Sequence, residues 1–146
     1  FELEYTGEDG QKHRPVMIHR VVLGSIERFI GVITEHFAGA FPLWLSPVQV
    51  KILTVTDRAD SYAAELAKAL DEKGFRVETD VRNEKIGKKI REATLEKVPY
   101  MLVVGDRDVE NQTVSVRTRS GEDLGAMSLE AFAAKMNGEV ETKAIQ

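Results

Sequence analysis

A dense group of cationic side chains lies between positions 82 and 97, in a chain whose formal net charge is −4. The basic residues there are Arg82, Lys85, Lys88, Lys89, Arg91 and Lys97, set against the acidic Glu84, Glu92 and Glu96. A local reversal of charge sign can bind a polyanion, but a charge run by itself is more often a solvated helix face. Asn83 stands in the same stretch, and its amide can either cap the following helix or contact a base edge. The pattern favours capping.

Arg117 and Arg119 form a second basic pair, on an alternating stretch that predicts a strand over 113–118. Side chains two apart share one face of a strand, so both guanidinium groups should project the same way. The simpler interpretation is an edge strand that its charges protect from aggregation. If this strand lies near the one that precedes Asn83, the two basic elements form a single groove. Guanidinium groups in such a groove can stack on, or hydrogen-bond to, unpaired bases.

An acidic turn is predicted over 106–110, where it would border that groove. Asp108 or Glu110 could accept a hydrogen bond from a base amino or imino group. Either residue could equally be only a polar member of the turn.

Arg28 is the other side chain with chemistry to offer. The apolar run 16–23 predicts a buried strand, Gly24 ends it, and Ser25 caps a helix that continues to Phe37. An arginine fixed between a strand and a helix start can hold a planar or anionic group from a rigid base. The three histidines do not cluster. His19, inside the apolar run, is interpreted as a satisfied core or cleft histidine.

The elements that must position these residues alternate in type from position 48 onward. Strands are predicted over 48–55, 75–81, 100–104, 113–118 and 124–127. Helices are predicted from Asp60 or Ser61 to Gly74, over 84–97, and from a Ser128 cap to Met136. This order predicts an α/β fold with a mixed, mostly parallel sheet flanked by helices. A β-hairpin beginning at Phe1 and the helix after Ser25 precede it, joined by a proline-containing segment that should pack.

Composition excludes several classes. The chain has 146 residues, 42% hydrophobic and 30% charged, and this is typical of a soluble globular protein. It has no cysteine, so disulfides and thiolate metal sites are excluded and a reducing compartment is the default. No apolar run approaches the roughly 20 residues that span a membrane. The start is neither an initiator Met nor a signal peptide, and we expect a chain cut from something longer.

The string Gly24–Phe29, Gly-Ser-Ile-Glu-Arg-Phe, resembles the third signature motif of class II aminoacyl-tRNA synthetases. In that family the arginine of this motif grips ATP, and the resemblance implies that catalytic role for Arg28. The first and second motifs, which supply the dimer contact and the main ATP-binding loop, are absent here. The resemblance therefore implies a fragment that is inactive alone and binds ATP weakly or not at all.

The sequence from Val81 to Thr94, followed by Val98 to Asp106, resembles the C-terminal anticodon-binding domain of the class IIa enzymes. With Met-Ile-His-Arg at 17–20, the chain is similar over nearly its whole length to the threonyl-tRNA synthetases. The resemblance divides the chain into three parts: a remnant of the antiparallel catalytic domain at 1–40, a linker at 41–47 and an anticodon-binding domain at 48–146.

Carried over residue by residue, the anticodon contacts of that family map onto Asn83, Arg91, Lys97 and Arg117, with Asp108 or Glu110 as acidic partners. Lys85 and Arg119 are further tRNA-binding candidates on the same elements. Lys97 stands where related enzymes often have arginine. Since lysine lacks the planar fork, a phosphate contact is favoured there over a bidentate base contact.

The resemblance also implies cofactors and partners for the longer parent enzyme. The histidine of Met-Ile-His-Arg ligates zinc in the threonine pocket of these enzymes, which makes His19 a metal candidate. Its cysteine and histidine partners come from earlier sequence, so zinc should not bind this chain tightly. The parent would be a cytoplasmic homodimer that uses ATP and Mg²⁺. Its partner would be tRNA, and neither DNA nor a membrane.

Three alternatives stay open. The module could belong to a prolyl, histidyl or glycyl enzyme, or to a non-catalytic accessory protein that binds another nucleic acid or a protein. It could also be a flavodoxin-like domain that binds a nucleotide at the strand ends. That fold favours a glycine-rich first strand-to-helix turn, and the turn at 56–59 contains none.

Overall fold

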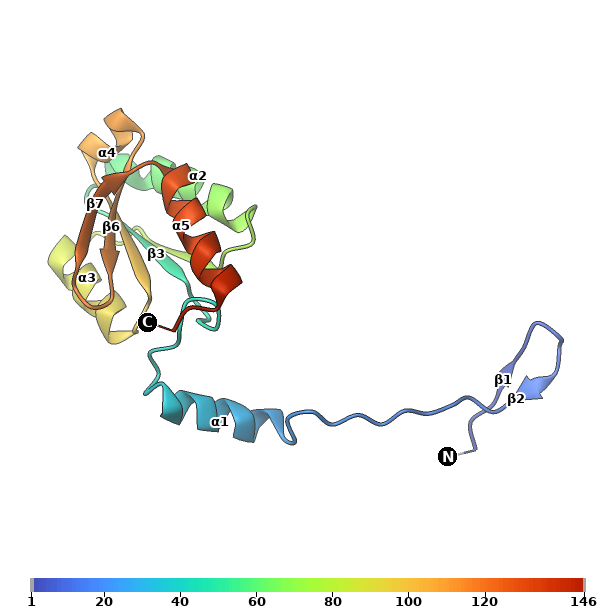
Figure 1. Ribbon diagram of the computed structural model, residues 1–146. Coiled ribbons are helices and arrows are strands. Elements are labelled where there is room, and N and C mark those ends of the chain that lie inside the picture. The colour runs from blue at the N-terminus through green and yellow to red at the C-terminus, as the bar shows by residue number, and fades with distance from the viewer. Residues whose placement is uncertain (1, 146) are drawn as a thin grey trace. The chain divides into compact units, whose positions relative to one another are not determined.

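The computed structural model describes residues 2–145, so Phe1, predicted to open the first strand, lies outside the described residues. Two compact units make up the chain, with the boundary between Val32 and Ile33. Figure 1 shows both units, and each is described by itself.

The first unit begins with a short hairpin. β1 (Tyr5–Thr6) pairs antiparallel with β2 (Lys12–His13), and Tyr5 lies opposite His13. The turn between them includes Gly10 at a φ of 74°, a conformation that glycine adopts without strain. The predicted hairpin is confirmed, but its second strand is much shorter than expected.

The strand predicted over 16–23 is wrong. These residues form no regular secondary structure, and Val16, Ile18, Val21 and Val22 are exposed. The apolar pattern was a local signal, whereas a strand needs a hydrogen-bonding neighbour. Among the described residues, no segment pairs with this run.

α1 (Ile26–His36) crosses the boundary between the units. Ser25 caps it as predicted, because its Oγ accepts from the Arg28 amide at 3.4 Å. The helix is followed by Ala38 and Gly39, both with positive φ. Gly39 therefore ends it in the usual way.

A single five-stranded sheet organises the second unit, in the order β4-β3-β5-β6-β7. The strands are β3 (Val50–Thr54), β4 (Val77–Asp80), β5 (Tyr100–Val104), β6 (Val114–Thr118) and β7 (Asp123–Met127). β3 pairs parallel with β4 and β5, while β6 and β7 add antiparallel ladders. The predicted mixed α/β sheet is confirmed.

The helices of this unit are η1 (Asp57–Ala59), α2 (Asp60–Asp71), α3 (Ile86–Leu95), α4 (Asp106–Asn111) and α5 (Leu129–Thr142). Ser128 caps α5 as predicted, and its side chain accepts from the Ala131 amide. The predicted acidic turn at 106–110 is instead helical. The Gly105 amide at its start donates to Asp108 Oδ2 at 3.0 Å, and Gln112 ends it in the left-handed region at a φ of 54°.

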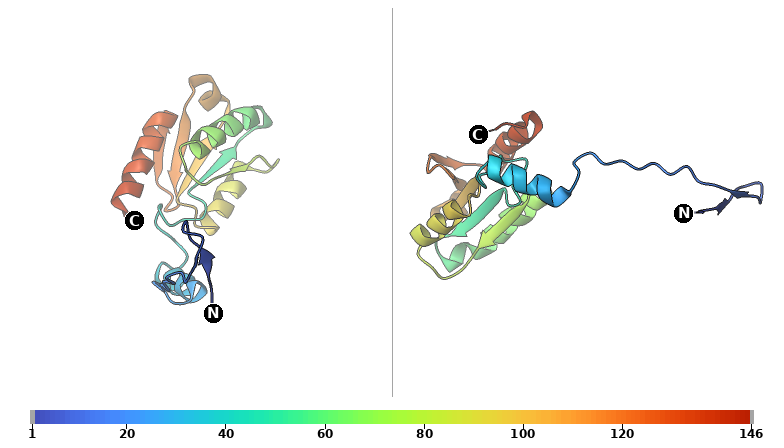
Figure 2. Two further views of the ribbon diagram at one scale, coloured as in Figure 1. Left: turned by 90° about the vertical axis from the view of Figure 1, so that its right-hand side faces the viewer. Right: turned by 90° about the horizontal axis from the view of Figure 1, so that it is seen from below.

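Two apolar clusters cover the two faces of the sheet. On one face, α2 and α5 pack against the strands through buried residues such as Leu66, Phe132 and Met136. On the other, Ala93 of α3 meets Leu53 and Met101. Figure 2 shows the second unit from two further sides, with its helices packed around the one sheet.

The proline-containing segment packs, as predicted. Leu43 is buried in the larger cluster, and Gln49 Nε2 donates to the Leu43 carbonyl at 3.0 Å. Arg76, just before β4, donates through Nε to Ser46 O at 2.9 Å and through Nη2 to Trp44 O. The segment is therefore part of the second unit rather than a loose tether.

Candidate nucleic-acid interface

Asn83 lies in the loop between β4 and α3. The helix begins at Ile86 with Lys85 as its N-cap residue, and no side chain caps it. The predicted capping role of Asn83 is therefore wrong, because the helix starts too far along the chain for its amide to reach the first turn. Asn83 is exposed, and its side chain makes no hydrogen bond within the described residues. An amide in that position can donate to and accept from a ligand.

Arg82 and Asp80 hold this loop in place. The guanidinium donates to the Asp80 carboxylate through Nε at 2.9 Å and Nη2 at 2.6 Å, and the Arg82 amide donates to Oδ1 at 3.1 Å. Nη2 also donates to Glu92 of α3 at 2.6 Å. These hydrogen bonds from Arg82 lower the pKa of the Asp80 carboxyl below its ordinary value of 3.8. The residue before Asn83 is thus tied to both β4 and α3.

Lys89 is buried, with 2% of its surface exposed, although the sequence predicted it on a solvent or phosphate face. The predicted core stripe of α3 is correct for Ile86, Ile90 and Ala93. Lys89 lies three residues after Ile86 and four before Ala93, so it points inward with them. Its Nζ donates to Thr54 O at 2.9 Å and Asp80 O at 3.0 Å.

A pocket of about 470 Å³ opens where β3 and β4 end. Its walls are the two loops that leave these strands, and it is lined by Thr54, Val55, Thr56, Asp57, Val81, Arg82, Asn83, Glu84 and Lys89. The carboxyl ends of parallel strands are the usual ligand position in open α/β sheets. Sequence reasoning missed the β3 side of this pocket. The same strand-end rule, applied to the residues after Thr54, could have found it.

Lys85 and Arg91 flank the start and middle of α3. Both are exposed, and neither side chain forms an ion pair within the described part of the chain. Lys88, by contrast, is paired with Glu84 at 2.7 Å. Lys85 and Arg91 are therefore the cations of this helix that remain available to an anionic partner.

Arg117 does not lie beside Asn83. β6 is separated from β4 by β3 and β5, a span of roughly 14 Å at the usual strand spacing. Arg117 is half-buried, and its Nε lies 3.5 Å from Asp123 Oδ2 on β7. The two strands are not neighbours, so the condition under which we expected a single groove is not met.

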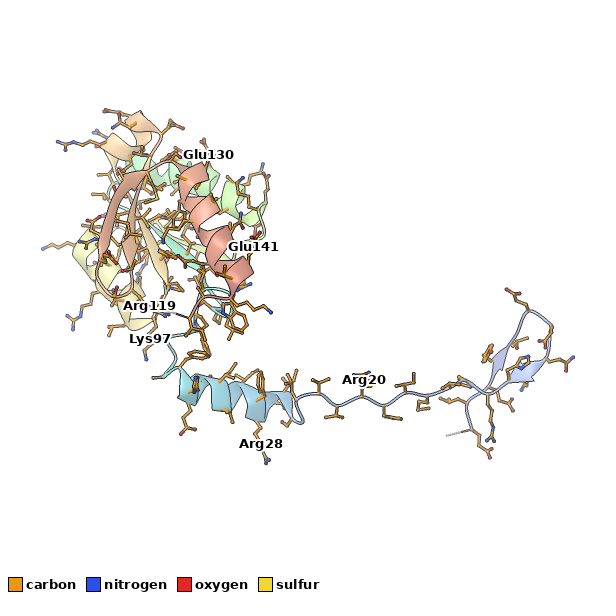
Figure 3. All side chains as sticks on the ribbon, viewed as in Figure 1. Arg20, Arg28, Lys97, Arg119, Glu130 and Glu141 are labelled. Atoms are coloured by element: carbon orange, nitrogen blue, oxygen red, sulfur yellow. The ribbon has the colours of Figure 1, made fainter. Side chains whose placement is uncertain are left out.

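Lys97 and Arg119 lie together at the other end of the sheet, where β5 begins. Lys97 Nζ donates to the Ala38 carbonyl, and Arg119 Nη1 donates to the Phe41 carbonyl at 2.5 Å. Figure 3 shows both labelled side chains in this place. Burial lowers the pKa of the Arg119 guanidinium from its ordinary value. Within the second unit, these two cations tie the segment 38–41 to the residues that flank β5 and β6. Their tRNA contact stays a prediction.

Asp108 and Glu110 differ in their surroundings. Asp108 accepts from the Gly105 amide at 3.0 Å and from Ser115 Oγ at 2.9 Å, so it joins the start of α4 to β6. Glu110 is exposed at the end of α4. Of the two predicted acidic partners, Glu110 is the one without internal hydrogen bonds among the described residues.

The candidates in the first unit are exposed. Arg28 lies on α1 and is exposed, and its guanidinium forms no hydrogen bond or ion pair within the described residues. His19 lies in the irregular run, with its Nε2 3.0 Å from the sulfur of Met17, so its expected core or cleft position is wrong. Among the described residues, no group of three or more His, Asp or Glu side chains could hold a metal.

The chain is similar to a known protein family and to several known proteins. The family model described as "Anticodon binding domain" matches residues 49–139. The chain is 64% identical over 143 residues to a threonine–tRNA ligase of Acetivibrio thermocellus, covering 98% of this chain and 22% of that protein. It is 60% identical over 146 residues to that of Clostridium tetani, covering all of this chain and 23% of the relative.

A solved structure is also similar. It is described as the RNA binding domain of threonyl-tRNA synthetase from Cryptosporidium parvum Iowa II, with a TM-score of 0.76 and 35% identity. The match covers 93% of this chain and 35% of that one. This chain thus spans less than a quarter of the length of the curated relatives it matches. None of the helices between residues 2 and 145 has the length and apolarity needed to cross a bilayer.

Proposed function

Because the chain belongs to the anticodon-binding-domain family, we propose that its second unit recognises the anticodon loop of a threonine tRNA, as part of a threonine–tRNA ligase. The identity to proteins of that name supports the choice of tRNA. The longer protein would join threonine to its tRNA at the expense of ATP.

The observation that carries the proposal is the amide of Asn83 at the mouth of the strand-end pocket. It is exposed, without an internal partner among the described residues, and set in a loop that Arg82 fixes at both sides. Unpaired bases are read by such rigidly held donors and acceptors. Lys85 and Arg91, which form no ion pair with any described residue, supply positive charge for the phosphates along α3.

Arg117 is the second base-reading candidate. Its guanidinium is held by Asp123 on the neighbouring strand, and it offers paired donors suited to a guanine edge. Since it lies three strands from β4, it would read a different base from Asn83. Glu110, exposed at the end of α4, could accept from a base amino group.

The cofactors of the parent enzyme do not fit this chain alone. Zinc would need ligands besides His19, yet the described residues hold no metal-binding group and the chain has no cysteine. For ATP, Arg28 supplies one exposed guanidinium, too little to offset the cost of immobilising a ligand. We propose both cofactors, and homodimer formation, only for the longer protein. Its place would be the cytoplasm, where tRNA is charged, with no role on DNA.

The test is titration of the chain with anticodon stem-loops. We expect tighter binding of a loop with a threonine anticodon than of loops whose central or third anticodon base is changed. Replacing Arg117 with alanine should cost on the order of 1–3 kcal/mol and flatten that preference.

Lys88 provides the matched control, since it is a surface cation whose ion pair is with Glu84, its neighbour one turn earlier on the chain. Its alanine variant should weaken all loops about equally and reduce the salt dependence. If Arg117→Ala behaves in the same way, with its preference intact, its base-reading role is refuted. A wild-type preference for a proline, histidine or glycine anticodon would instead identify one of the related enzymes.

A further inference from the structure

The ammonium group of Lys89 is enclosed by protein acceptors. Its Nζ lies 2.9 Å from Thr54 O, 3.0 Å from Asp80 O and 3.3 Å from Thr54 Oγ1. An ammonium has three donors, and each of them has an acceptor here. The carboxylate of Asp80 lies 4.0 Å away and is itself buried. The group is therefore fully satisfied inside the domain.

A lysine is a costly choice for this position if packing were its only task. Ile86 and Ala93, its neighbours on the core stripe of α3, are apolar. Burying an ammonium loses its hydration, and apolar residues of similar volume often stabilise such positions better. Its hydrogen bonds to the carbonyls of Thr54 and Asp80 indicate a structural role at the ends of β3 and β4.

Those acceptors lie where two strands part. The last register pair between β3 and β4 is Leu53 with Asp80, and beyond it the chains diverge into the two loops that wall the pocket. The ammonium bridges Thr54 O on one side to Asp80 O on the other. Together with the Thr54 hydroxyl, whose Oγ1 donates to Asp80 O at 3.3 Å, the ammonium holds the two walls at a set separation.

The Lys89 bridge is also linked to Asn83, whose side-chain amide is the proposed base-reading group. Asp80, whose carbonyl accepts from Lys89, carries the carboxylate that holds Arg82, and Arg82 is followed by Asn83. Two sets of hydrogen bonds thus fix the start of the β4–α3 loop. Lys89 binds the Asp80 carbonyl, and Arg82 binds the carboxylates of Asp80 and Glu92.

We propose that Lys89 is a positioning residue for base recognition, whose buried ammonium sets the width of the strand-end pocket for one unpaired nucleobase. The proposal rests on the proposed function. The three donors of the Lys89 ammonium are all taken by protein acceptors, so it offers none to the base or to a phosphate. It acts by keeping Thr54 and Asn83 at the spacing that the correct base requires.

The experiment compares Lys89→Met with Lys88→Met in the full chain. Both changes remove one positive charge at adjacent positions, but only the first removes the bridge. Each variant is titrated with the threonine stem-loop and with loops changed at one anticodon base, over a series of salt concentrations. Circular dichroism at the same temperature confirms that each variant is folded.

We expect the wild-type preference, roughly tenfold for a single base change, to fall to about twofold or less in Lys89→Met. The salt slope of that variant should stay unchanged, since no phosphate contact is lost. Lys88→Met should keep the preference. A folded Lys89→Met that discriminates as well as the wild type would overturn the positioning role. Absence of any preference in the wild type would refute the proposed function instead.

A second measurement covers the case in which Lys89→Met does not fold. An ammonium shielded from water exchanges slowly enough for its protons to be observed by NMR in the wild-type chain. Its signal, assigned by its absence in Lys89→Arg, should shift when the threonine loop binds and stay in place with the base-changed loops. Equal shifts with all loops, or none with any, would overturn the proposal.

Discussion

The hydrogen-bonded ion pair between Asp80 and Arg82 gives a stability prediction whose magnitude follows from the structure. Asp80→Asn keeps one oxygen to accept from the Arg82 amide and Nε, but it loses the charge and the acceptor for Nη2. The Asp80 side chain is 4% exposed, and removing one member of a buried pair can cost about 3–5 kcal/mol. Because 55% of the Arg82 side chain is exposed, water screens part of this interaction. We expect a loss of about 2 kcal/mol.

The same pair predicts a pH dependence. The pKa of Asp80 is lowered on folding from its ordinary value of 3.8. Its contribution is therefore fully present well above pH 3.8 and is lost as the pH falls through 3.8 towards the lower folded pKa. Asp80→Asn lacks this titration, so the difference in unfolding free energy between wild type and variant should shrink as the pH falls towards 3.

Urea denaturation monitored by fluorescence is the assay, because Trp44 is the single tryptophan and lies in the second unit. Glu78→Gln is the matched control. It removes the same charge from the same strand, at a side chain that is 54% exposed and pairs with Lys51 at 3.6 Å. That change should cost less than about 1 kcal/mol. A loss below about 0.5 kcal/mol for Asp80→Asn, or a difference that does not vary with pH, would refute the reasoning.

Two further stability predictions concern α5. Ser128→Ala removes the hydroxyl that accepts from the Ala131 amide at 3.2 Å, and it should cost about 1 kcal/mol in thermal or urea unfolding; an unchanged midpoint would show that the cap contributes nothing. Phe132→Ala opens a cavity beneath the edge-to-face contact with Tyr100, at ring centroids 5.5 Å apart, and should cost about 3–5 kcal/mol. Leu95→Ala, at a side chain that is 70% exposed, is its control and should change stability by less than about 0.5 kcal/mol.

The element types of the second unit could be predicted because their signals are local. A fully apolar run marked β5, Gly74 ended α2, and Ser128 capped α5. The run at 16–23 carried an equally strong apolar signal, yet no strand forms there. Strand formation depends on a partner that the local pattern does not contain.

In the candidate site, too, the residues with local signals could be predicted and those that depend on tertiary partners could not. Asn83 could be found from its place between a strand and a helix, and the structure leaves its amide available. The burial of Lys89 could not be predicted, because it depends on strand-end carbonyls that only the tertiary fold brings over α3. Lys97 and Arg119 were predicted to bind tRNA, and their internal hydrogen bonds could not be foreseen for the same reason. Their acceptors, the carbonyls of Ala38 and Phe41, are distant in sequence.

The hydrogen bonds from Lys97 and Arg119 to the segment 38–41 limit how the anticodon-binding module can be transferred between proteins. The family match begins at residue 49, whereas the compact unit begins at Ile33. The sixteen or so residues between, on the order of one extra helix turn and a loop, supply the carbonyls that Lys97 and Arg119 bind and the Leu43 side chain in the core. A gene fusion that carried only the shared module into a new protein would remove the Ala38 carbonyl from Lys97 and the Phe41 carbonyl from Arg119, and it would expose the apolar site that Leu43 covers. The neighbouring sequence must therefore travel with it, or be replaced by a segment that offers the same groups.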